Sequence, residues 1–166
     1  MAKHDSPTDR DRALREHLLE LLRGGHAHVE FDRAVGGLPA KLRGAKPPGQ
    51  PHTPWRLLEH MRIAQRDILD FSRDGSHVSP DWPEGYWPVG DGPPDEKAWD
   101  QSVESFKADA TAMQDLVANK ATDLIAPIPG GQGQTLLREA LLVADHNAYH
   151  LGQLIIIRRL LGAWKD

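Results

Sequence analysis

Residues 136–161 read LLREALLVADHNAYHLGQLIIIRRLL, and this stretch decides the fold. It follows Thr135, whose hydroxyl can cap a helix, and it precedes Gly162, a residue typical of the position after a helix end. Apolar residues occupy nearly all sides of this helix, so we expect it to be buried on most sides. Polar residues interrupt its middle: Asp145, His146, Asn147, His150 and Gln153. Buried polar side chains cost free energy unless they find partners, so the stretch predicts a polar site inside a helical protein.

Apolar residues at three- and four-residue spacing predict three more helices, over about residues 9–37, 54–71 and 95–118. Thr53-Pro54 marks the start of the second one, with a hydroxyl cap followed by proline. Gly24-Gly25 interrupts the first; the glycines either kink one long helix or separate two short ones, and we favour the kinked helix. No segment alternates with a period of two, so no substantial sheet is expected.

The connection over residues 74–94 is rich in proline and glycine but also contains Trp82, Tyr86 and Trp87. Exposing such aromatics forfeits apolar burial, which argues against a flexible linker. We expect an ordered loop packed across one end of the bundle, where it could roof a site. Four helices and two long connections predict an all-α four-helix bundle with at least one crossover along its length.

The length of 166 residues suits one domain, which we place at residues 9–166 after a disordered tail at 1–8. The net charge of −4 argues against a nucleic-acid partner, since phosphate recognition requires a basic face. The chain has no cysteine, which excludes disulfides, zinc–thiolate sites and a cysteine nucleophile.

Two further features bear on location. The polar N-terminus lacks the apolar core of a signal peptide, and the apolar stretch 151–161 is too short and too charged to span a bilayer. The prediction is a soluble, cytoplasmic protein with no membrane partner.

Three histidines form the candidate metal site. His146 and His150 are four residues apart, so both rings project from one face of the last helix and can converge on one ion. His60 lies midway along the second helix, beside its apolar stripe. Helical bundles build metal sites from side chains on facing helices, so the three together favour a shared divalent ion. Packed histidines in a metal-free core are the alternative. Candidate partners for the rings are Asp145, Asn147, Gln153, Glu59 and Asp67.

The stretch WRLLEH at 55–60, together with DHNAYHLGQ at 145–153, resembles the DinB-like superfamily, which includes bacterial thiol-dependent transferases and isomerases. The resemblance extends over about residues 12–164. It implies a bundle with up-down-down-up helix order, metal ligands at His60, His146 and His150, and a homodimer. Leu151 departs from the pattern, because many members have an arginine after the second histidine of this motif.

The resulting hypothesis is a metal-dependent enzyme that activates a thiol or water for transfer, isomerisation or hydrolysis on a small molecule. A low-molecular-weight thiol is a candidate substrate, and the catalytic residues are not assigned. Imidazole ligands suit several divalent metals, of which we expect zinc or nickel. The alternative is a non-catalytic metal-binding or stress-response module, for which a fourth protein ligand is expected.

Overall fold

The structure, a computed structural model, describes residues 7–165. Four long helices, α1 (Pro7–Arg23), α4 (Pro54–Arg73), α5 (Ala98–Ala118) and α6 (Leu136–Leu160), account for most of it. Two short helices, α2 (Phe31–Val35) and α3 (Ala40–Arg43), and a 3-10 turn, η1 (Glu84–Tyr86), lie between them. The predicted all-α fold is confirmed, since pairing of strand type within the described residues is limited to an isolated bridge between Pro127 and Thr135.

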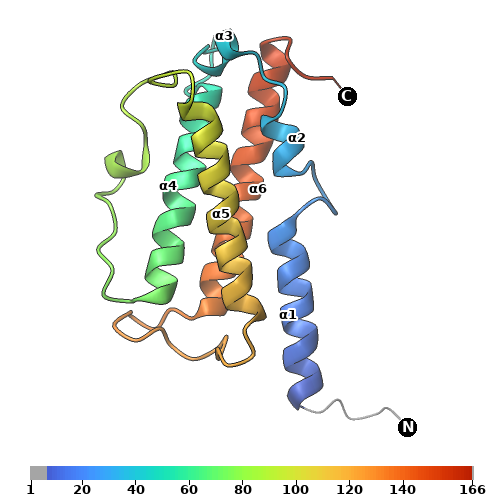
Figure 1. The fold of residues 1–166 in the computed structure, drawn as a ribbon, viewed down its shortest axis with the longest axis vertical. Coiled ribbons are helices and arrows are strands. Elements are labelled where there is room, and N and C mark those ends of the chain that lie inside the picture. Colours follow the sequence, from blue (N-terminus) through green and yellow to red (C-terminus); the bar gives the residue numbers. More distant parts are fainter. Residues whose placement is uncertain (1–6, 166) are drawn as a thin grey trace.

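The path of the chain explains the long connections. In Figure 1 the chain rises through α1, descends through α4, returns beside α4 as residues 74–97, descends through α5 and rises through α6. Helix α4 packs against both α5 and α6. No helix in residues 7–165 combines the length and the apolar character that a bilayer crossing requires.

Helix starts follow the predicted caps. The Thr53 and Thr135 side chains accept hydrogen bonds from the backbone N–H groups of Arg56 and Arg138, each at 3.2 Å. Helix α5 begins at Ala98, three residues after its predicted start. Asp95 lies outside the helix because its Oδ1 accepts the backbone N–H of Ala98, at 2.9 Å.

The kinked first helix was wrong. Gly24 and Gly25 have φ angles of 71° and 85°, which a right-handed helix cannot contain, and they end the first helix instead of bending it. The chain then resumes as the separate helix α2. Of the predicted tail, residues 1–6 lie outside the described residues, and α1 already includes Pro7 and Thr8.

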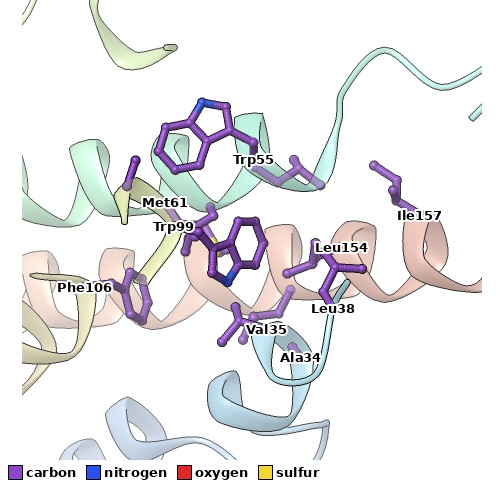
Figure 2. Close-up of a cluster of buried hydrophobic side chains, with 13 residues drawn as sticks. Ala34, Val35, Leu38, Trp55, Met61, Trp99, Phe106, Leu154 and Ile157 are labelled. Carbon is purple, nitrogen blue, oxygen red and sulfur yellow. The ribbon is translucent and has the colours of Figure 1, made fainter. Parts of the chain in front are cut away.

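Two apolar clusters form the core. The first joins α2, α4, α5 and α6 around side chains such as Met61, Trp99 and Leu154, which converge in Figure 2. The second includes Leu18 of α1, Leu69 of α4 and Met113 of α5. Burial of these side chains, at roughly 25 cal/mol per Å² of apolar surface, is the main favourable contribution to folding.

A polar pair lies in the buried interior of the bundle. The Gln65 side chain is 1% exposed, and its Nε2 donates to the carbonyl oxygen of Phe106 at 2.7 Å. Its Oε1 accepts from Asn147 Nδ2 at 2.8 Å. Both polar atoms of the Gln65 amide are therefore used within the protein, and the pair links α4, α5 and α6 at one level of the bundle.

Helix α6 is less buried than its sequence predicted. Leu141, Tyr149, Ile156 and Leu160 are exposed, because the neighbouring helices cover only its inner side. Apolar residues occupy nearly all sides of α6, so the sequence has no polar stripe that would indicate its outer face.

Replacing Leu154 with alanine should lower the free energy of unfolding by about 2–5 kcal/mol, because its fully buried side chain would leave a cavity. Leu141→Ala, on the exposed side of the same helix, is the control and should change it by less than about 0.5 kcal/mol. Urea denaturation followed by circular dichroism measures both. Equal losses for the two variants would contradict this description of the core.

Candidate metal centre

Helices α4 and α6 bring the three predicted histidines together. His60 comes from α4, and His146 and His150 come from successive turns of α6. One ring nitrogen from each lies within 4.8 Å of those of the other two. The ring centroids form a triangle with sides of 4.5–4.9 Å. The structure therefore assembles this trio as the sequence predicted, although residues 60 and 146 are far apart in the chain.

Hydrogen bonds orient two of the rings. His60 Nδ1 lies 2.8 Å from the carbonyl oxygen of Tyr86, which can only accept, so Nδ1 carries the proton. His150 Nδ1 lies 2.7 Å from Gln153 Oε1, which likewise accepts. In a neutral imidazole the other nitrogen then has a free lone pair. Both Nε2 atoms are thus the available ligand atoms.

The third ring completes the set. His146 Nε2 lies 3.1 Å from His60 Nε2. Since His60 Nε2 carries no proton, His146 donates this hydrogen bond in the metal-free protein. Ligand nitrogens about 2.0–2.1 Å from a tetrahedral zinc ion would be separated by about 3.4 Å, so the observed spacing suits a shared ion.

Burial keeps the three rings neutral. It lowers the pKa of His146 from 6.5 to about 4, and the neighbouring His150 and His60 add to the effect. Burial also lowers the pKa of His150 to about 4, against the opposing effect of its hydrogen bond to Gln153. The pKa of His60 is lowered by burial as well, partly offset by the Tyr86 carbonyl. Neutral imidazole is the form that binds a metal ion.

The segment between α4 and α5, residues 74–97, is the crossover loop, and it covers one side of the trio. The Trp87 ring stacks on His60, with 3.9 Å between centroids and 2° between planes, and it also stacks on His52 at 4.2 Å. The Arg56 guanidinium lies over Trp87 and donates to the carbonyl of Pro88 at 3.1 Å. The loop thus packs against the site, but it lies along the side of α4 and not across one end of the bundle as the sequence predicted.

Further hydrogen bonds hold this loop along α4. Thr53 Oγ1 donates to the Asp91 carbonyl at 2.6 Å. Near the other end of α4, Asp67 accepts from the Tyr86 hydroxyl at 2.7 Å and lies 2.9 Å from His77 Nε2. Loop residues with decreasing numbers therefore meet α4 residues with increasing numbers, so the loop runs antiparallel to the helix.

Of the five candidate partners for the rings, Gln153 accepts a hydrogen bond from His150 Nδ1. Asn147 bonds to Gln65 and also acts on His146, whose pKa it raises against the effect of burial. Asp145 is exposed. Glu59 forms an ion pair with Arg62 at 2.8 Å. Asp67 is bound to the loop, as described above.

Sequence reasoning missed the partner of His60, which is the backbone carbonyl of Tyr86. A carbonyl has no sequence signature; the aromatics of the loop were the available signal. Of the other histidines, His28 is exposed and bonds to the carbonyl of Val29, away from the trio. Leu151 is buried in the first apolar cluster.

A model of the DinB superfamily matches residues 23–154. The chain belongs to the DinB superfamily. The match includes all three histidines of the trio and the whole crossover loop. No curated protein sequence matches the chain significantly.

The low pKa values of the histidines predict that the stability of the protein depends on pH. Between about pH 6.5 and pH 4 the unfolded chain protonates these histidines while the folded protein holds them neutral, so the unfolded state binds more protons. The contribution of these histidines to the free energy of unfolding of the metal-free protein is therefore fully present above about pH 6.5 and is lost as the pH falls towards 4. Urea denaturation across this range, with chelator present, measures the slope.

The His146→Ala/His150→Ala double variant should show a shallower slope than the wild type, because two of the titrating rings are gone. His17→Ala is the matched control, since His17 is exposed on α1, and its slope should equal that of the wild type. An unchanged slope in the double variant would contradict burial of neutral histidines.

Proposed function

We propose that this DinB-superfamily protein binds one divalent metal ion through Nε2 of His60, His146 and His150. We further propose that it acts as a metal-dependent enzyme on a small molecule. The observation that carries the proposal is that one ring nitrogen of each histidine lies within 4.8 Å of those of the other two. At His60 and His150 a hydrogen bond at Nδ1 leaves the lone pair of Nε2 free.

The donor set fits such an ion. Neutral imidazoles suit zinc and nickel, and hydrogen bonds at Nδ1 are the usual means of orienting a histidine ligand. Among residues 7–165, no further histidine, cysteine or carboxylate lies close enough to share this ion with the three histidines. Three protein ligands leave a coordination position for water or substrate, which supports a catalytic rather than a purely structural ion.

When bound, the ion would lower the pKa of a coordinated water or thiol and polarise a carbonyl group. The protein's own residues prepare for this chemistry. The Tyr86 carbonyl and Gln153 fix the ring orientations, and Trp87 shields one face of His60 from water. The reaction we propose is activation of a thiol or water for transfer, isomerisation or hydrolysis.

Metal content, measured by plasma mass spectrometry on untagged protein after incubation with zinc or nickel, tests the metal site. We expect about one equivalent per chain. The His146→Ala/His150→Ala variant should lose it, whereas His17→Ala should retain it. Wild-type protein that retains no metal under these conditions would refute the proposal.

Gln153→Leu should weaken metal affinity by about 10- to 100-fold, because His150 would lose the acceptor that orients its ring. Competition with a chromogenic chelator measures the affinity. Gln101→Leu, at an exposed position of α5, is the control and should bind as the wild type does. Unchanged affinity in Gln153→Leu would show that this hydrogen bond does not support the site.

A further inference from the structure

An open cavity of about 270 Å³ lies beside the histidine trio. Helices α4 and α6 and the crossover loop enclose it, and His60 and His146 form part of its wall. A molecule in this cavity would therefore contact two of the three proposed ligands. Apolar cavities of about 150 Å³ are large enough to bind benzene, so this one can hold a group the size of one ring.

Most of the cavity wall is apolar. The apolar residues that line it are Ala64 and Ile68 of α4, Leu142 of α6 and Trp82 of the loop. The Trp82 side chain is 76% exposed although it adjoins this apolar surface. A bound apolar group would cover part of the indole, and this burial would favour binding.

The polar groups of the cavity away from the trio are already satisfied. The Tyr86 hydroxyl donates to Asp67 Oδ2, and Asp67 Oδ1 lies within hydrogen-bond distance of His77 Nε2. Neither group requires a ligand to complete its hydrogen bonds. Lysine and arginine are absent from the residues that line the cavity, so none of them offers a lasting positive charge to an anionic group. Discrimination here must come mainly from apolar contact.

We propose that this cavity is a binding site for an uncharged apolar group of about one ring, carried by the substrate. The inference rests on the proposed function, because it takes the trio as the place where the reacting atom of that substrate lies. It assigns substrate selection to Leu142, Ile68 and Trp82, which hold the apolar part, and the remaining reactive group would extend towards His60 and His146.

The probe for this site is 4-fluorobenzyl alcohol, whose binding to the full-length protein is followed by fluorine NMR. Titrations use the metal-loaded protein and the same protein after chelation. We expect saturable binding in both forms, with a Kd of about 1 mM, as is usual for a fragment of this size. Because the chelated protein is included, failure of the metal proposal would leave this result readable.

Two variants locate the binding site. Leu142→Asp should weaken binding at least about tenfold, because a carboxylate would replace apolar wall, whereas the exposed neighbour Leu141→Asp should bind within about twofold of wild type. Trp82→Ala should weaken binding about threefold or more, and its exposed position makes unfolding no concern. Val89→Ala, fully exposed on the same loop, is its control.

Each result of these titrations either supports or overturns the proposed binding site. Weaker binding in Leu142→Asp and Trp82→Ala, with normal helicity and unchanged metal content, supports the site. If Leu142→Asp does not fold, Trp82→Ala alone decides. Absence of saturable binding, binding that requires the ion, or a Trp82→Ala variant that binds as the wild type does would overturn the proposal.

Discussion

The hydrogen bond from His60 Nδ1 to the Tyr86 carbonyl, at 2.8 Å, is the interaction on which the site depends. It fixes the tautomer of His60 and turns Nε2 towards α6. It also anchors the crossover loop at the level of the trio, where Trp87 stacks on the same ring. One bond therefore determines both the orientation of a proposed ligand and the position of the loop above it.

The loop is held by a series of such contacts rather than by an apolar core of its own. Successive parts of the returning segment bind to Thr53, the residue that caps α4, and to Arg56, His60 and Asp67 of α4. A segment of this length needs many fixed dihedrals, and each ordered residue costs about 1–2 kcal/mol of conformational entropy. Contacts distributed along α4 offset that cost along the whole segment. They also leave room for the cavity lined by Trp82 and Leu142.

Sequence reasoning predicted the helices from local spacing, and it predicted the trio from that spacing together with the facing helices of a bundle and the family resemblance. A four-residue interval places His146 and His150 on one face whatever the tertiary fold, and the apolar stripe around His60 directs it inward. The loop partners could not be predicted, since they depend on how residues 74–97 align with α4, and a backbone carbonyl is the same at every position. The break at Gly24-Gly25 was one of two alternatives, and the wrong one was favoured for a related reason. Helix propensity measures the cost of glycine within a helix but does not show when the chain adopts a positive φ instead.

The burial of three imidazoles close together is costly for the metal-free protein and favourable for an ion. Without an ion, His146 and His60 share a single hydrogen bond between their Nε2 atoms, and protonation of any ring would place a charge beside the other two. The low pKa values show that the fold resolves this conflict by keeping the rings neutral. A divalent ion would therefore find all three rings neutral at neutral pH and, at His60 and His150, an Nε2 atom that is already oriented and free of a proton. The cavity beside His60 and His146 has a mostly apolar wall, so a group bound in it would exclude water from the open side of the trio.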